Sequence, residues 1–369
     1  IRLRASHTDY RHDEREHGET TTRFDNEGVD ARIEVHHAPL AGWRGVAGIQ
    51  HARTRAGASG EEALLPTVKS RSTGLFLVEH LEISEAVHLE LGLRQEWQRY
   101  RPVNDARGRA PFRGAATSFS AATVWQPTEG HTLSLTVGHH ERLPHAQELY
   151  ARGVHLATNT YECGLLPGTC GGEDYAPLRQ EASRNIELGW RGSAGRLDLA
   201  ASAYINEVDD YTHASTLDAV EEFRLVRYAQ RDARFHGAEI EASWRLTPLL
   251  SATLFGDFVR ARFAGGGHLP RIPPARYGGR LAAERGEFTL QLELVRIEAQ
   301  HRIADFESRT PGHERLDFTL RQRLGGTGLS WYLRGSNLLD QRIRNHSSFV
   351  ADSVPLPRRN LAFGVNLSF

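Results

Sequence analysis

Histidine and acidic side chains gather in two polar stretches of this chain, and both stretches are candidate metal-binding segments. The first covers residues 10–25 and carries His12, Asp13, Glu14, Glu16 and His17. Imidazole nitrogen and carboxylate oxygen together suit a borderline divalent ion such as zinc. A solvated charged loop has the same composition, and composition alone favours that simpler interpretation.

The second polar stretch, residues 144–183, is longer than a structureless connection in a compact domain usually is. It contains His145, Glu148, His155 and Glu162. Such a length indicates a segment with a function, so its histidines are candidate metal ligands. A single loop histidine is more often only solvated, which is the competing interpretation for His155.

Cys163 and Cys170, the only cysteines of the chain, lie in the same stretch. In an exported protein a close pair of cysteines indicates a disulfide. On the chain-entropy model so short a loop contributes roughly 2–3 kcal/mol of stability. A thiolate pair that binds a metal is the alternative interpretation.

Sequence motifs of other chemistries are missing. The chain has no nucleophile elbow, Walker loop, dinucleotide fingerprint or CxxC pair. Its formal net charge of −1 gives no support for nucleic-acid binding. We therefore expect a binding protein rather than an enzyme, with no permanent cofactor and no nucleic-acid partner.

The last residues of the chain indicate the kind of secondary structure that must position the two polar stretches. Apolar residues occupy every second position there: Leu361, Phe363, Val365, Leu367 and Phe369. Successive side chains of a strand point to opposite faces, so this is a strand with one apolar face and one small, polar face. A transmembrane barrel turns the apolar face to lipid and the polar face to its lumen. No run approaches the roughly 18 apolar residues of a membrane helix.

The same alternation recurs along the chain and predicts an all-β, antiparallel transmembrane barrel of about sixteen strands. Short turns rich in Gly, Pro, Ser and Thr separate the strands at 84–86, 127–130, 192–195, 247–248, 285–287 and 325–328. Long polar connections alternate with these turns. If the last strand ends in the periplasm, counting back places the short turns in the periplasm and the long loops outside.

Tryptophan positions support this orientation. Five of them fall at the short-turn ends of predicted strands, namely Trp43, Trp125, Trp190, Trp244 and Trp331, whereas Trp97 falls near a long loop. An aromatic belt at a membrane interface predicts such clustering. Packing in the core of a soluble sandwich would spread the residues along the strands.

Residues 141–162 read ERLPHAQELYARGVHLATNTYE, and this stretch resembles the barrel of TonB-dependent outer-membrane receptors, in particular their zinc-uptake branch. Residues 185–189, 237–241, 309–313 and 337–340 are similar to segments that many receptors of this superfamily share. The family has a 22-stranded barrel filled by a plug, on which the inner-membrane TonB complex pulls. The resemblance, the lower strand count and a start within an alternating segment imply that residues 1–369 are the C-terminal part of such a barrel, with the plug and first strands missing.

The resemblance implies a Gram-negative outer-membrane protein that takes up zinc, or a zinc complex, and contacts lipid and, through the plug, the TonB complex. In the zinc branch, a loop histidine in the segment matching 153–159 contributes to the metal site with an acidic residue of an earlier loop. Mapped onto this chain, this points to His155 and, more loosely, Glu14. Asp13 or Glu16 can replace Glu14 in that alignment. His12 and His145 complete the set of candidate ligands.

Two other functions remain open from the sequence. Haem receptors of the superfamily carry FRAP and NPNL boxes around a loop histidine, and this chain has only the partial matches ERLP at 141–144 and APL at 176–178. His145 and His155 lie between them, so uptake of haem, or of a siderophore, is the second expectation. A passive porin is the third, because about sixteen strands is a porin number.

Overall fold

Alternating apolar and polar residues produce a structure made almost entirely of β-strands. The computed structural model describes residues 1–60, 63–103, 105, 108–170, 176–220 and 223–368. The first seven strands are β1 (Arg2–Glu16), β2 (Glu19–His36), β3 (Trp43–Gly60), β4 (Thr67–Ser84), β5 (Val87–Val103), β6 (Phe112–Thr128) and β7 (His131–Arg142). A connection follows that contains α1 (Ala146–Tyr150), β8 (Arg152–His155), a 3-10 turn (Leu156–Thr158) and β9 (Thr160–Cys163). The remaining strands are β10 (Glu181–Ala194), β11 (Leu197–Val220), β12 (Phe223–Arg245), β13 (Leu250–Phe263), β14 (Arg276–Arg285), β15 (Phe288–Ile297), β16 (His313–Leu324), β17 (Leu329–Ser336) and β18 (Asn360–Leu367).

These strands form one antiparallel meander. The strands from β1 to β7 pair in chain order, β7 pairs with β10, and the strands from β10 to β18 pair in chain order again. The sheet has 18 strands, and because β8 and β9 belong to the connection, sixteen make up the meander. The predicted fold class and strand number are therefore confirmed.

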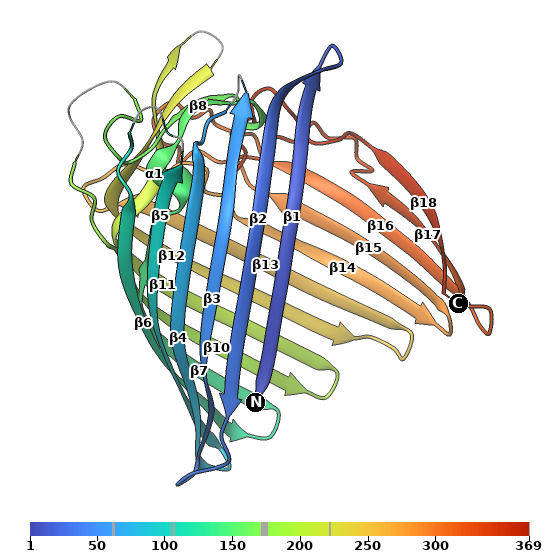
Figure 1. Ribbon diagram of the computed structural model, residues 1–369. Helices are drawn as coiled ribbons and strands as arrows, with labels where there is room; N and C mark the ends of the chain where they lie inside the picture. The colour runs from blue at the N-terminus through green and yellow to red at the C-terminus, as the bar shows by residue number, and fades with distance from the viewer. Residues whose placement is uncertain (61–62, 104, 106–107, 171–175, 221–222, 369) are drawn as a thin grey trace.

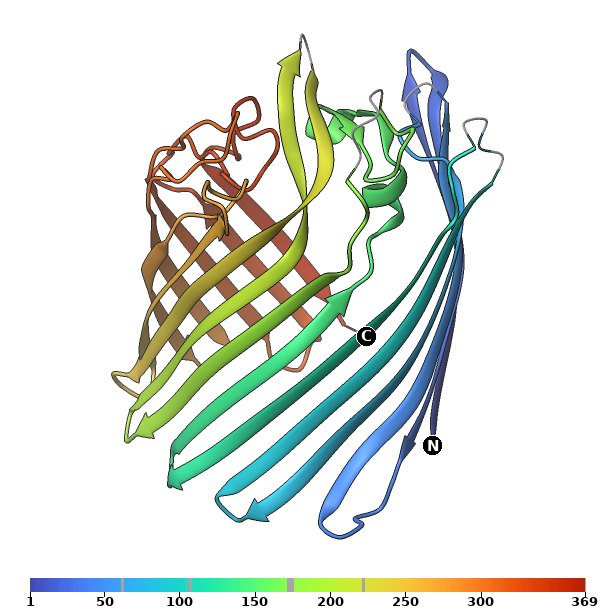
Figure 2. The same cartoon turned by 90° about the vertical axis from the view of Figure 1, so that its left-hand side faces the viewer.

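The meander curves into a barrel-like wall (Figures 1 and 2). Its first and last strands, β1 and β18, lie apart in both views and have no pairing with each other among the described residues. The described part of the chain contains no separate plug domain inside the wall. No helix among the described residues is long and apolar enough to cross a membrane.

The two faces of the wall differ as the alternation predicts. On β10 the outward side chains of Ile186 and Leu188 are 58% and 55% exposed. The intervening Glu187 lines a concave cavity that it shares with Glu239 of β12 and Asp257 of β13. An apolar outside and a polar inside are what a barrel in lipid requires.

The tight turns lie where the sequence predicts them, and so do the tryptophans. The connections after β4, β6, β10, β12, β14 and β16 contain only a few residues each and lie at one end of the wall (Figure 1). Trp43 begins β3 and Trp244 lies one residue before the end of β12, both at this end. Trp97 lies on the other half of β5, toward the long loops. The wall therefore has a short-turn end and a loop end.

The prediction of a loop over residues 10–25 is wrong. β1 continues to Glu16 and β2 begins at Glu19, so that only a tight turn at His17 and Gly18 separates them. Both turn residues have positive φ values, 50° and 88°, which is typical of a two-residue hairpin turn. Charged side chains of opposite sign face each other across the hairpin and support it, and one such pair is Arg23 with Asp13 at 2.8 Å.

Candidate ligand-binding site

The long connection between β7 and β10 contains regular structure over residues 146–163 and lies at the loop end of the wall. In Figure 2 this green segment lies between the yellow β11–β12 hairpin and the blue strands β1 to β4. β8 and β9 form a short antiparallel pair, and β9 also pairs in parallel with residues 224–227 of β12. The connection is thus held to the projecting part of the wall by backbone hydrogen bonds.

Apolar contacts seat this connection on the opposite side as well. Leu149 and Tyr150 of α1 are completely buried and pack with Val68 of β4 and Tyr100 of β5. Burying a side chain of this size contributes roughly 1.5–3 kcal/mol. The Arg152 backbone N–H also donates to a carbonyl of the β3–β4 connection at 2.8 Å. Contacts on both sides therefore fix residues 146–163, which we call the platform.

Arg142, the last residue of β7, joins the two ends of the connection. Its guanidinium group donates to Glu148 in α1 at 2.8 Å and to Glu181 at the start of β10 at 2.7 Å. Glu148 in turn accepts the backbone N–H of His145 at 2.7 Å, at the N-terminus of α1. This network fixes where the connection leaves and rejoins the wall.

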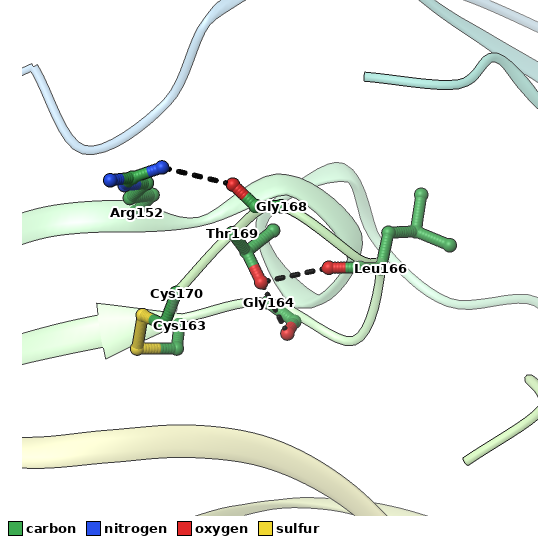
Figure 3. Close-up of a disulfide and its surroundings, with 7 residues drawn as sticks. All are labelled: Arg152, Cys163, Gly164, Leu166, Gly168, Thr169 and Cys170. Atoms are coloured by element: carbon green, nitrogen blue, oxygen red, sulfur yellow. Dashed lines mark hydrogen bonds between the residues drawn. A yellow bond between two sulfur atoms is a disulfide. The ribbon is translucent and has the colours of Figure 1, made fainter. Parts of the chain in front are cut away.

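A disulfide follows β9 in the same connection (Figure 3). Cys163 and Cys170 are bonded, with Cα atoms 5.5 Å apart, and Cys163 is fully buried. The Thr169 hydroxyl donates to the Leu166 carbonyl at 2.8 Å, which tightens the turn between the cysteines. Arg152 of β8 donates to the Gly168 carbonyl at 3.1 Å, so the turn is held against β8.

His155 and Glu162 form the centre of the platform. The Nδ1 atom of His155 lies 2.6 Å from Oε1 of Glu162, and the Glu162 side chain is almost completely buried. The other carboxylate oxygen accepts hydrogen bonds from the Gln147 amide at 2.8 Å and from the Tyr228 hydroxyl at 3.2 Å. A buried carboxylate with several donors is stabilised in its charged form. Glu162 therefore acts as a fixed negative anchor for the His155 ring.

The electrostatics of the pair follow from these contacts. The hydrogen bond that His155 donates to Glu162 raises the pKa of His155 above its ordinary value, against the opposing effect of burial, and the nearby charge of Glu14 adds to the rise. Burial alone would raise the pKa of Glu162, but the hydrogen bonds of His155, Gln147 and Tyr228 outweigh it and lower that pKa. The two groups thus form an ion pair at mildly acidic pH, between the ordinary pKa values of 4.5 for the carboxyl group and 6.5 for the imidazole.

The orientation of His155 leaves one ring nitrogen available. Its side chain is 31% exposed, and Nε2 has no hydrogen-bond partner in the part of the chain that the structure describes. In metal sites a ligating histidine usually gives its other N–H to a carboxylate, which sets the tautomer and aims the free nitrogen. The His155–Glu162 pair has this arrangement and could supply one metal ligand.

The other predicted ligands lie apart from this pair. His12 and Glu14 are neighbours on one face of β1, 3.9 Å apart, and Glu14 is close enough to affect the pKa of His155. Asp13 forms an ion pair with Arg23, and the exposed His145 is the N-cap residue that precedes α1. Among the described residues no three His, Cys, Asp or Glu side chains are gathered so that they could hold a metal ion together.

Sequence reasoning missed the residues that organise the pair. Gln147 precedes Glu162 by 15 positions and Tyr228 follows it by 66 positions. Neither residue belongs to a recognisable metal motif, so no local signal indicated them. The resemblance singled out His155, whereas the polar character of the loop pointed to Glu162 only as a member of a larger group.

The ion pair is expected to hold β8 and β9 most firmly at mildly acidic pH. Because the pKa of His155 is raised above 6.5, its contribution is complete below 6.5 and is lost as the pH rises through the raised value. Because the pKa of Glu162 is lowered below 4.5, its contribution is complete above 4.5 and is lost as the pH falls through the lowered value. Amide hydrogen exchange over residues 152–163, corrected for the intrinsic rate, should therefore show maximal protection between these two values. The same profile in a Glu162→Gln variant would contradict this assignment.

Comparisons with known proteins agree with the geometry of the wall. A family model described as "TonB dependent receptor-like, beta-barrel" matches residues 3–338. A solved structure entitled "Copper transporter OprC" superposes with a TM-score of 0.80 at 18% identity, covering 94% of this chain and 57% of that one. The FrpB iron transporter from Neisseria meningitidis gives 0.69 at 15% identity, with coverages of 94% and 55%. The ferric yersiniabactin uptake receptor FyuA from Yersinia pestis gives 0.58 at 15% identity, with coverages of 99% and 56%. The chain thus spans just over half the length of each of these structures.

Proposed function

The chain belongs to the TonB-dependent receptor-like β-barrel family, and from that premise we propose that it forms barrel wall and ligand-capturing loops of an energised metal transporter in the Gram-negative outer membrane. The proposed cargo is a divalent metal ion, with zinc as the first candidate. The proposed partners are the TonB complex, reached through a plug, and the surrounding lipid. The loop end of the wall is its extracellular side.

The observation that carries this proposal is the oriented His155 ring. Its Nδ1 is held by the buried carboxylate of Glu162 at 2.6 Å, while Nε2 is free to bind a ligand. Neutral imidazole is a common ligand of zinc and copper. A platform fixed on both sides and presenting one such nitrogen is suited to capture a metal ion that arrives from outside.

The donor atoms of this chain favour a borderline divalent ion over a soft one. The sequence contains no methionine, and both cysteines are bonded to each other. Thioether and thiolate ligands, which select Cu(I), are therefore not supplied by these residues. Imidazole and carboxylate groups remain, and they suit Zn²⁺ or Cu²⁺. Copper is the second candidate, since the solved structure with the TM-score of 0.80 is that of a copper transporter.

A metal site shared between separate elements suits transport. His155 lies on the platform, whereas Glu14 and His12 lie at the loop end of β1. We place the metal between these two groups, with further ligands completing the three or four that zinc requires. Movement of one element relative to the other would break the coordination shell and release the ion. Tight capture and later release are then properties of the same site.

Calorimetric titration of the purified protein in detergent tests this function. Zn²⁺ and Cu²⁺ are titrated in parallel, and haem binding is followed by its absorbance. Saturable binding of either ion at a 1:1 ratio supports the proposal and ranks the two metals. Binding of haem or of a ferric siderophore without binding of either ion would move the function to the corresponding uptake class. Solute flux through the protein in vesicles without TonB would instead support a passive porin.

A further inference from the structure

The outer face of strands β3 to β6 carries two rows of positive charge at the loop end. Arg53, Arg71, Arg99 and Arg113 occupy directly opposed positions on the four neighbouring strands. Arg55, Lys69 and Arg101 form a second row one step nearer the loops. All seven side chains are exposed. We call these seven residues the cationic face.

The cationic face points to the same side as the apolar surface of the wall. Side chains on a strand share a face when an even number of positions separates them. Arg53 therefore shares a face with Ile49, and Arg71 with Leu75, whose side chains are 40% and 46% exposed. The two rows of basic residues therefore adjoin, on the side of the loop end, the apolar surface that we place against lipid.

Trp97 marks the boundary between the apolar and charged parts of this face. It is two positions before Arg99 on β5 and is 45% exposed. Two residues of a strand correspond to about 7 Å. Amphipathic tryptophan rings prefer the level of the lipid headgroups, so the first row of arginines lies at or just above that level.

The positive charges of this face are only partly balanced by the protein, since Glu27 of β2 lies opposite Arg55 at its edge and no carboxylate lies opposite the other six residues among the described pairings. None of the seven residues has a carboxylate within ion-pair distance in the described ranges; the Arg53 guanidinium donates only to the His51 ring, at 3.0 Å. Two arginines on the outer face of β10 and β12 do form ion pairs: Arg184 with Asp209 at 2.9 Å and Arg234 with Glu207 at 3.6 Å. Like charges directly opposed on neighbouring strands repel each other and destabilise a sheet. An external anion would relieve this repulsion.

We propose that the cationic face binds the phosphate groups of an anionic lipid of the outer leaflet, with the acyl chains of that lipid lying on the apolar surface below. Arginine presents a planar fork that matches phosphate oxygens. Neighbouring strands are about 4.8 Å apart, so the four-residue row spans about 14 Å and can contact more than one phosphate. The proposal rests on the membrane placement given under the proposed function, but not on the metal site.

Binding of a defined lipid tests the assignment. The protein is freed of lipid in detergent and titrated with diphosphorylated lipid A and with the same lipid after removal of its phosphates. Inorganic phosphate is added in a third arm. The test variant is Arg53→Gln/Arg71→Gln/Arg99→Gln/Arg113→Gln. The control variant is Arg184→Gln/Arg234→Gln, which removes charge from paired arginines on the same outer surface.

We expect the test variant to bind the phosphorylated lipid at least about tenfold more weakly, since each basic residue near an anionic surface contributes about fivefold. The control variant should bind it as the unmodified protein does. Equal binding by both variants, equal binding of the dephosphorylated lipid, or competition by millimolar inorganic phosphate would each overturn the proposal. If the test variant does not fold, as judged by heat-modifiable migration in gels, the comparison of the two lipids on unmodified protein decides. Zinc titration of the same samples shows separately whether the metal site is intact.

Discussion

Replacement of His155 by alanine is expected to lower the affinity of the protein for Zn²⁺ by about 100-fold or more. The substitution removes the Nε2 atom of His155, which has no hydrogen-bond partner among the described residues and is oriented by the Nδ1 contact with Glu162. Loss of a supporting partner alone typically costs 10–100-fold in metal affinity. Calorimetry of the purified variant gives the affinity directly. Metal binding should also weaken as the pH falls through the raised pKa of His155, because only the neutral ring binds the metal.

Two variants separate a direct role of His155 from a general effect on folding. Glu162→Gln keeps an acceptor for the His155 N–H but removes the charge, so zinc affinity should fall by about 10–100-fold, and the midpoint of its pH dependence should move to lower pH. His131→Ala is the matched control, because this histidine stacks on Trp190 at the short-turn end of the wall. If His131→Ala weakens zinc binding as much as His155→Ala does, the site is not on the platform.

Replacement of Arg142 by alanine is expected to loosen the whole platform, at a cost of about 2–3 kcal/mol in its local free energy of opening. Removing one partner of a buried ion pair leaves the other charge without compensation, which costs roughly 3–5 kcal/mol when burial is complete. Glu148 and Glu181 are each mostly buried, with 16% and 12% of the side chain exposed, and both would lose their shared cation. The lower value allows for the partial exposure of Arg142. Hydrogen exchange of residues 146–163 measures the effect.

Matched substitutions show whether the platform is stabilised by the bridge to two carboxylates or by the positive charge alone. Arg142→Lys keeps the charge but cannot bridge two carboxylates with a planar fork, so an intermediate loss of protection is expected. Arg184→Ala breaks an exposed pair with Asp209 and should change stability by about 1 kcal/mol or less. Unchanged protection of α1 in Arg142→Ala would mean that apolar packing alone seats the platform.

Much of the wall follows from the sequence because its signals are local. Alternation with a period of two is read over a few residues, and so are the glycines and prolines of tight turns. These signals predicted sixteen meander strands, the short-turn end and the level of the tryptophans. They failed over residues 10–25, where charged side chains suggested a solvated loop. There, cross-strand pairs such as Arg23 with Asp13 continue the hairpin to the turn at residues 17–18.

The chemistry of the site depends on contacts that no local pattern encodes. Besides His155, the partners of Glu162 come from α1 and from β12, and the second is 66 positions away. The cationic face requires Arg53 of β3 and Arg113 of β6 to reach the same level across the two intervening strands, through the pairings of β4 and β5. A shift of one residue in any of these registers would move an arginine from the outer to the inner face.

The sequence by itself therefore determined where the strands lie and which of their faces is apolar, because adjacent residues encode both. Only the tertiary structure decided which distant charges meet, because register and loop packing are cooperative properties of the whole sheet.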